Sequence, residues 1–294
     1  MFKPTATTAR PHDDTDADNL YCVTTVRPDH LHISGTFNYR DVGGLRTAGG
    51  AKIRTGVLLR SAQLCRLDAR GHDTLRRLGV ATVHDLRGPG EAARMGSDLL
   101  PEGVRLEVTP FHPDVGAGAP HESGAADAAT EAEFASGSGS GRAPHEAGTT
   151  GGHPLDLLGV YAEFPTMPLA GIAIEAMARS LARGDGAVLV HCAAGKDRTG
   201  WAVATLLRAV GVDEDDIMAD FLLSNEAADA LAADMARSYG TGATIAPDLL
   251  GVRSDYLTAG TDAMRERYGD LDGYLAAIGI TPELRAALHT RLLE

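Results

Sequence analysis

The sequence predicts an α/β fold with a mainly parallel central sheet that is flanked by helices. Short β-branched runs alternate along the chain with segments of helical periodicity. The two clearest runs, VATVHDLRG at 80–88 and AVLVHC at 187–192, each follow a helical pattern. This alternation is typical of strands that are joined by helical crossovers and therefore lie parallel. For 294 residues, one domain is the economical count.

Further strand and helix signals lie on both sides of these runs. In the helix expected at 67–79, Asp68 can cap the first turn and Gly79 can end the last one. Pro282 stands at the first position of the last helix, where proline is best tolerated. The other expected elements are strand-and-turn segments at 38–44 and 57–61, a strand within 104–114 that runs into a proline-containing loop, and helices at 168–183, from Thr199 to Val210, from Asp213 and through most of 225–294.

Two segments stand apart from this pattern. Residues 1–27 are rich in Thr and Asp without periodicity, and we expect a flexible tail before a folded domain at 28–294. Residues 115–153 are rich in Ala, Gly and Ser and cannot bury enough apolar surface to offset the entropy of ordering. We interpret them as a flexible, low-complexity insertion. Their histidines lack the close spacing of metal ligands, so no metal site is expected.

The charge balance is acidic, with 40 Asp and Glu residues against 27 Lys and Arg residues and a formal net charge of -13. Such a balance argues against nucleic acid or an anionic membrane as the main partner. No stretch reaches the roughly 18 apolar residues that a membrane span needs, so stable membrane insertion is not expected. An anionic substrate would need a locally basic pocket on this acidic body. We expect a monomer or a weak oligomer.

The three cysteines, Cys22, Cys65 and Cys192, are too few and too odd in number for a disulfide framework. They suit a reducing compartment. The N-terminal residues contain no apolar core of the kind that a signal peptide has. We therefore expect a cytoplasmic protein, and export without a signal peptide stays open.

The turn at 192–198, between an apolar strand and a helix, holds the residues that carry chemistry. Ligands of α/β sheets bind outside the carboxyl ends of the strands, which is where this turn lies. Successive backbone N–H groups in a tight turn form a nest for an anion, and the helix that follows adds the positive end of its dipole. The predicted phosphate-binding residues are Ala193, Ala194, Gly195, Lys196, Asp197 and Arg198.

Cys192 and Arg198 are the predicted nucleophile and phosphate clamp. The field of the turn favours a thiolate, which is the reactive form of cysteine. The planar fork of Arg198 matches two phosphate oxygens, whereas a lysine offers a point charge. Displacement at phosphorus by the sulfur gives a phosphocysteine, which water later hydrolyses. Thr199 can donate a hydrogen bond to the departing thiolate.

A phosphate monoester also needs a carboxylic acid that protonates its leaving oxygen. Asp114, on a proline-bearing loop after a strand, is the first candidate. Asp85, which lies in VHDLRG and also at a strand end, is the rival, although it can instead cap the turn or pair with Arg87. Asp197, inside the turn itself, is a third candidate.

Two other interpretations of the turn compete with this one. A lone cysteine at a strand end is more often a core residue than a nucleophile, and a bare Cys-x5-Arg spacing is common by chance. The full pattern HCxxGxxRTG between a strand and a helix is far more specific. A Walker A loop is excluded, because Val190 stands where glycine is required and Asp197 stands where Ser or Thr is required.

The same residues resemble the cysteine-dependent tyrosine phosphatases, and among them an atypical bacterial family with tyrosine and phosphoinositide activity. HCAAGKDRTG resembles the signature of that family, and NYRDVGG, DLR, YAEFPT, DFLLSN and GVRSDYL resemble further stretches of it in the same order. The resemblance implies a tyrosine-phosphatase-like fold with a helical lid, here C-terminal, and no metal or organic cofactor. It places the nucleophile on Cys192, the phosphate-binding arginine on Arg198 and the general acid on Asp114. The chain departs from the family at 115–153 and at His112, an extra residue in the acid motif.

Lys196 and Asp197 bear on the substrate. Lysine at this position resembles the tensin-homologue lipid phosphatases, and aspartate at the next resembles the myotubularins. Lys196 could then meet a second phosphate, with Asp197 orienting either Lys196 or a water. Alternatively, Lys196 pairs with Asp41 or another surface carboxylate. A deep pocket lined by small residues suits an aryl phosphate, so phosphotyrosine is the first choice.

We therefore predict a protein-tyrosine phosphatase that acts on phosphotyrosine proteins through a phosphocysteine on Cys192. The alternatives are a phosphoinositide or phosphoserine/threonine phosphatase of broad specificity and a non-catalytic module that binds phosphoproteins. An arsenate reductase on the same turn would need resolving cysteines close by, and Cys22 and Cys65 are distant in sequence.

Overall fold

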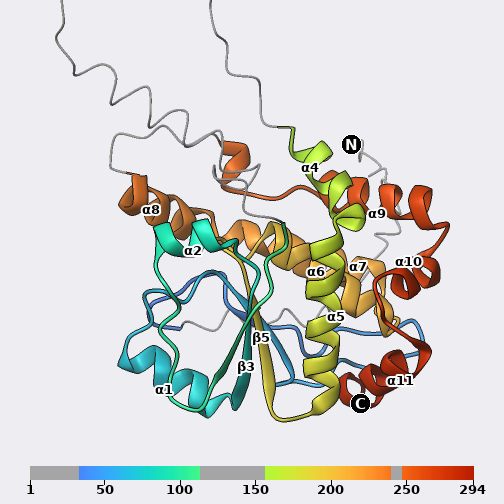
Figure 1. The fold of residues 1–294 in the computed structure, drawn as a ribbon, viewed down its shortest axis with the longest axis horizontal. Coiled ribbons are helices and arrows are strands. Elements are labelled where there is room, and N and C mark those ends of the chain that lie inside the picture. The colour runs from blue at the N-terminus through green and yellow to red at the C-terminus, as the bar shows by residue number, and fades with distance from the viewer. Residues whose placement is uncertain (1–32, 113–155, 240–246) are drawn as a thin grey trace, which may run out of the picture.

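The computed structural model describes residues 33–112, 156–239 and 247–294 and has a five-stranded sheet at its centre (Figure 1). The strands are β1 (Arg40–Asp41), β2 (Leu58–Ser61), β3 (Val80–Asp85), β4 (Arg105–Val108) and β5 (Ala187–His191). Their order in the sheet is β1-β2-β5-β3-β4, with β2, β5, β3 and β4 parallel and β1 antiparallel to β2. The predicted α/β class with a mainly parallel sheet is confirmed.

β5 runs through the middle of the sheet and separates two apolar layers, because alternate residues of a strand point to opposite faces. Val188 and Val190 face the larger core, which is built with α5 (Pro168–Arg183) and α6 (Asp197–Ala209). Leu189 faces the smaller core, to which α1 (Ala69–Arg77) contributes Leu75. Figure 1 shows α1 and α5 on either side of β3 and β5. With both faces covered, every residue of β5 is buried.

The helices expected at 67–79 and 168–183 are confirmed as α1 and α5. The Asp68 carboxylate accepts the backbone N–H of Gly71 at 2.9 Å and caps α1. Gly79 follows the end of α1 with a φ of 65°, a conformation that glycine adopts readily.

The strand predicted at 80–88 runs too far. β3 ends at Asp85, because the Asp85 carboxylate accepts the N–H of Arg87 at 2.9 Å and turns the chain into α2 (Pro89–Met95), a helix that was not expected. β4 ends at Val108, where its partner β3 has ended, and Pro110 lies in the loop that was expected after this strand.

The C-terminal part is helical, as expected. The helices after α6 are α7 (Glu214–Leu222), α8 (Ala228–Tyr239), α9 (Ser254–Tyr268), α10 (Leu271–Ala277) and α11 (Pro282–Leu292). Helix α4 (Leu157–Glu163) precedes α5 between β4 and β5, and short 3₁₀ turns lie at Phe164–Thr166, Leu223–Ala227 and Pro247–Leu249. α4 and α9 pack side by side near the top of Figure 1.

Several predictions fall outside the described residues. They concern the tail at 1–27, the insertion at 115–153, Asp114 and Cys22. The organisation of 28–294 as one domain also stays a prediction. Within the described residues, no single helix has both the length and the apolar composition to cross a membrane. Residues 157–166 and 168–183 meet that test only when taken together, as a pair bent by 65°.

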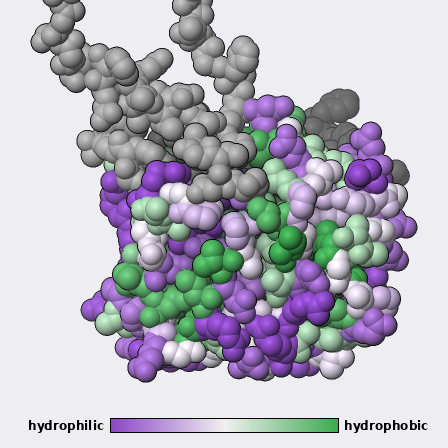
Figure 2. All heavy atoms as spheres, in the orientation of Figure 1, coloured by the Kyte–Doolittle hydropathy of each residue, from purple (hydrophilic) through white to green (hydrophobic). Residues whose placement is uncertain are grey.

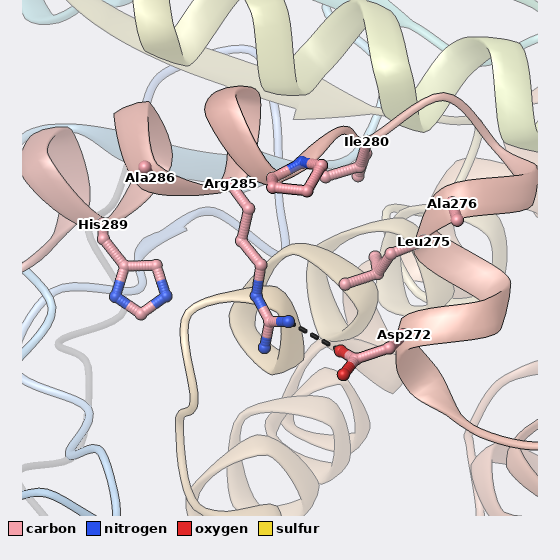
Figure 3. A pocket seen from close by; sticks show the side chains of 8 residues that line it. Asp272, Leu275, Ala276, Ile280, Arg285, Ala286 and His289 are labelled. Carbon is pink, nitrogen blue, oxygen red and sulfur yellow. Dashed lines mark hydrogen bonds and ion pairs between the residues drawn. The ribbon is translucent and has the colours of Figure 1, made fainter.

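A surface pocket of about 570 Å³ lies between α10 and α11 (Figure 3). Leu275 and Ile280 line it, and Arg285 donates hydrogen bonds to Asp272 Oδ1 and to the Ala209 carbonyl, each at 2.6 Å. Arg285 therefore ties both C-terminal helices to the end of α6. None of the predicted site residues lines this pocket.

Gly260 lets α9 approach two neighbouring helices closely. A Cβ at this position would lie 2.7 Å from Cζ3 of the buried Trp201 in α6 and 3.0 Å from the Tyr161 carbonyl in α4. We expect Gly260→Ala to lower the free energy of unfolding by about 1–2 kcal/mol, although alanine is the better helix former, because α9 must move outward. Thermal unfolding followed by circular dichroism measures the change.

The control is Gly49→Ala, where the added Cβ meets only Thr47 Oγ1, at 3.8 Å. We expect this variant to keep the wild-type Tm within about 1 °C. Equal Tm values for the two variants would contradict the close packing of α9.

Candidate active site

The turn after β5 lies at the carboxyl end of the parallel strands, the edge at which ligands bind in sheets of this kind. Cys192 directly follows β5 and is a free, buried thiol. Helix α6 begins at Asp197, two residues before the expected start, so that Arg198 and Thr199 lie in its first turn. The structure thus brings the predicted residues from Cys192 to Thr199 together.

Three consecutive carbonyl groups of this turn are bonded from outside it. The Ala193 carbonyl accepts the Gln63 N–H at 3.0 Å, the Ala194 carbonyl accepts Asn38 Nδ2 at 3.0 Å, and the Gly195 carbonyl accepts Arg60 Nη2 at 2.8 Å. Because a planar trans peptide points its C=O and N–H in opposite directions, outward carbonyls turn the N–H groups that follow them inward. The turn therefore has the form of a nest that can bind an anion.

Gly195 is the one position of the turn that requires glycine. Its φ is 69°, and an added Cβ would lie 2.2 Å from the Ser61 carbonyl oxygen at the end of β2. No side chain fits into this contact. The close approach of the turn to β2 is therefore possible only without a Cβ.

Asp220, in α7, positions the side chains that hold the turn. Its Oδ1 accepts Arg40 Nε at 2.7 Å, its Oδ2 accepts Arg60 Nη1 at 2.6 Å, and all three residues are buried. Arg40 Nη1 in turn donates to Asn38 Oδ1 at 2.6 Å. Burial favours the neutral form of Asp220, but the two guanidinium groups outweigh it and hold the pKa of the carboxyl below its usual value.

These supporting residues were not among the predicted site residues, because they come from distant parts of the chain. A signal for them existed, however. Asn38 and Arg40 lie in NYRDVGG and Asp220 lies in DFLLSN, two of the stretches that carry the family resemblance.

Glu91, in α2, also was not predicted and fixes the guanidinium of Arg198. Arg198 Nη1 and Nη2 donate to the two oxygens of Glu91 at 2.5 and 2.7 Å, and both side chains are buried. The same carboxylate accepts the N–H of Gly88 at 2.9 Å and completes the capping box of α2. His112 Nε2 lies 3.5 Å from Arg198 Nη1. A glutamate three residues after a capping glycine is a helix-start pattern that could have indicated α2.

Lys196 is buried and does not stand exposed at the rim of the turn. Its Nζ lies 2.8 Å from Asp197 Oδ2 and donates to the Gly251 carbonyl at 3.2 Å. The Tyr161 hydroxyl of α4 donates to Asp197 Oδ1 at 2.7 Å. Asp41 instead accepts two backbone N–H groups near β1, so Asp197 is the carboxylate partner of Lys196. These bonds tie the turn to α4 and to the loop before α9.

His191 lies between Cys192 and two carboxylates. Its Nε2 lies 2.8 Å from Asp98 Oδ2, and its Nδ1 lies 3.1 Å from the Cys192 carbonyl oxygen. Burial by itself lowers the pKa of His191, but Asp98 and Asp85 outweigh it and hold the pKa above its usual value. With an acceptor at each ring nitrogen, the imidazolium form fits here and places a positive charge next to Cys192.

Asp85 is bound by Arg87, the pairing that was weighed against its role as an acid. Arg87 Nη2 donates to Asp85 Oδ2 at 2.7 Å and to Asp98 Oδ1 at 2.9 Å. Asp85, Asp98 and His191 place possible ligand atoms within 4.8 Å of one another. Because the Arg87 guanidinium already bonds both carboxylates, a metal ion would have to displace it, and we interpret the cluster as an ion-pair network.

The two remaining predicted residues differ in what the structure shows of them. Thr199 Oγ1 is buried and has no hydrogen-bond partner among the described residues, so it is available to the sulfur of Cys192. Asp114 lies outside the described residues. Phe111, three residues before it, is fully buried, and His112 lies beside Arg198.

A buried thiol before an anion nest that ends in a fixed arginine defines a phosphatase of the cysteine-dependent class. Residues 31–294 match the model of a family described as the tyrosine phosphatase family. The chain is 37% identical over 268 residues to the triple specificity protein phosphatase PtpB of Mycobacterium tuberculosis, covering 85% of this chain and 94% of that one. It is 35% identical over 243 residues to a putative tyrosine-protein phosphatase of Cupriavidus necator, covering 81% and 80%.

The chain therefore belongs to the tyrosine phosphatase family, and the predicted family and phosphatase activity are confirmed. Among solved structures, that of TpbA from P. aeruginosa covers 78% of this chain and 89% of its own, with 18% identity and a TM-score of 0.31. A likeness this weak carries no argument about the site.

Asp98→Asn should lower the pKa of His191, because it removes the nearest negative charge. In the wild type we expect His191 to titrate above about 6.5. Burial lowers the pKa of His84 to about 4, with smaller contributions from the charges of Arg183 and His191, and His84 should change less than His191 in the variant. Nuclear magnetic resonance of the imidazole signals between about pH 3 and pH 9 measures both values.

The raised pKa of His191 contributes stability that is fully present below about pH 6.5 and is lost as the pH rises through the folded-state pKa. Urea unfolding of the wild type should therefore show this loss, and Asp98→Asn should show less of it. A wild-type His191 pKa below about 6.5 would contradict the ion pair.

Proposed function

We propose that this protein hydrolyses phosphotyrosine monoesters through a phosphocysteine intermediate on Cys192. The observation that carries the proposal is the outward bonding of the three turn carbonyls, which leaves a nest of N–H groups between Cys192 and Arg198. Such a nest, held in place before the substrate arrives, stabilises the negative charge on phosphate oxygens during transfer.

In the first step, Sγ of Cys192 attacks phosphorus and the bond from phosphorus to the tyrosine oxygen breaks. Arg198, oriented by Glu91, donates to two phosphate oxygens. In the second step, water attacks the phosphocysteine, inorganic phosphate forms and the thiolate leaves. Thr199 Oγ1 donates a hydrogen bond to that departing thiolate.

We assign the general acid to Asp114, which protonates the tyrosine oxygen as it leaves and later takes a proton from the attacking water. The two rival carboxylates are committed elsewhere, since Asp85 is bound by Arg87 and Asp197 is bound by Lys196. Protonation of Asp197 or Asp85 would take a counter-charge from the buried Lys196 or the buried Arg87, which would then keep only Asp98.

Phosphoinositides are the second substrate class. The relative from Mycobacterium tuberculosis is named a triple specificity phosphatase, and Lys196 is the residue of the turn that could contact a second phosphate. A second phosphate would have to compete with Asp197 and the Gly251 carbonyl for Lys196 Nζ. This competition is why phosphotyrosine comes first. The reducing cytoplasm keeps a catalytic thiol active, and we propose it as the compartment of action.

Hydrolysis of a phosphotyrosine peptide in excess EDTA tests the assignment of Cys192. We expect turnover in the wild type and a loss of at least about a thousandfold in Cys192→Ser, because the hydroxyl is a far weaker nucleophile at neutral pH. Cys65→Ser is the matched control, since Cys65 is the other free thiol of the described residues, and it should retain activity. The same assay with phosphoinositides measures the second substrate class.

No turnover in the wild type, together with tight binding of the peptide by wild type and Cys192→Ser alike, would mean that the turn only binds phosphoproteins. Turnover that requires an added metal ion would contradict the proposed cofactor-free mechanism.

Asp114→Asn tests the general acid. We expect kcat to fall by about 10²–10⁴ for aryl phosphates with poor leaving groups and far less for activated ones, which depart without a proton. Kinetics on a series of substituted phenyl phosphates measures this dependence. Asp85→Asn should lower the Tm by breaking the bond to Arg87, without dependence on the leaving group. Equal losses for all substrates would remove Asp114 from this role.

A further inference from the structure

One strand carries exposed apolar side chains at an edge of the sheet. Figure 2 shows that hydrophobic residues gather in patches on the surface. On β4, Leu106 is 41% exposed and Val108 is 56% exposed. Within the described residues, β4 pairs with β3 on one side and with no strand on the other. An exposed apolar edge of this kind is a template to which another strand can add.

The backbone of β4 directs N–H and C=O groups toward that open side. The Thr109 N–H donates to the Asp85 carbonyl of β3 at 2.9 Å. In a parallel ladder, successive residues alternate between bonding to the neighbouring strand and facing away from it. The N–H and C=O groups of Leu106 and Val108 therefore point away from β3.

The residues of this edge, VRLEV centred on Leu106, are complementary to themselves in the antiparallel direction. When Leu106 faces its own copy, Arg105 faces the partner's Glu107, and Val104 faces the partner's Val108. The three apolar side chains share one face of the strand and the two charged ones share the other. The paired ladder thus has one wholly apolar face and a second face with two Arg–Glu pairs.

The backbone fits the same register. Residues that bond directly across an antiparallel pair must both face the open side, and Leu106 opposite its copy can exchange two hydrogen bonds with it. A shift by one residue would set Leu106 against the partner's Glu107, whose backbone groups face β3. The self-centred register is therefore the one in which side chains and backbone agree.

Within one copy, the charged residues of β4 make ion pairs at the surface, and Arg105 Nη1 also donates to Thr82 Oγ1 of β3 at 3.0 Å. Arg105 lies 3.6 Å from Asp185, and Glu107 lies 3.2 Å from Arg183. Exposed pairs of this kind contribute little to stability, so Glu107 can turn to a partner at small cost, whereas Arg105 also gives up its bond to Thr82.

We propose that β4 is an interface at which a second copy of this chain adds in antiparallel fashion, about a two-fold axis at Leu106. The two five-stranded sheets then form one continuous sheet. The contact is the same on both copies and closes after two, so it does not lead to fibres.

Sedimentation velocity of the full chain between about 1 and 200 µM tests this interface. We expect a concentration-dependent dimer in the wild type. Leu106→Lys should weaken dimerisation by at least about tenfold, because it sets two ammonium groups against each other across the axis. Ile172→Lys, at an exposed aliphatic side chain on α5, is the matched control and should leave dimerisation unchanged.

Charge reversal identifies the register. Arg105→Glu alone or Glu107→Arg alone should weaken the dimer about tenfold, because like charges then face each other twice. The double variant should return to nearly wild-type dimerisation, since opposite charges face each other again. If the single variants weakened the dimer only by disturbing each monomer, the double variant should form an even weaker dimer. It loses both ion pairs within one copy, Arg105–Asp185 and Glu107–Arg183. Thermal unfolding checks that each variant is folded.

A wild type that stays monomeric over the whole concentration range overturns the proposal. The proposal is also overturned if the wild type forms a dimer that is weakened neither by Leu106→Lys nor by either single charge reversal. A double variant that is weaker than both single variants would overturn the register.

Discussion

The ion triad of Asp220 with Arg40 and Arg60 is the constraint on which the candidate site depends. Its members come from α7, β1 and β2, so it can form only when the sheet and the helical layer are both in place. Through Asn38 and Arg60 it holds two carbonyls of the turn outward. Removing the carboxylate would leave two buried guanidinium groups without a counter-charge, at a cost of several kcal/mol.

The other charged side chains of the turn are arranged in the same way. Glu91 holds Arg198 and at the same time completes the cap of α2, and Asp197 links Lys196 to Tyr161 of α4. Each link runs from the turn to a different element of the fold. A site held from several sides needs little reorganisation when a phosphate arrives, which is the condition under which fixed dipoles act most strongly.

The sequence could predict those parts of the site whose residues are consecutive in the chain, and not the contacts between distant residues. The turn around Cys192 was recognisable because its chemistry lies in consecutive residues at one junction of strand and helix. Asp220 and Glu91 act through contacts with residues more than a hundred positions away, and no local pattern reveals those partners. α2 was missed because the Gly-Pro-Gly sequence at 88–90 is typical of a turn and here starts a helix. The burial of Lys196 depends on a carbonyl at Gly251 that no local pattern reveals.

The pairing of cations with carboxylates at the turn governs how a substrate arrives. Arg198, Lys196 and His191 each face an acidic side chain, so their charges largely cancel at a distance. Farther out, the field is that of a body with a formal net charge of -13. A phosphorylated protein is therefore not steered in from solution, and the nest acts on it only at contact, where backbone dipoles are felt. Selection among phosphorylated proteins then falls to the surface that each presents around its phosphate.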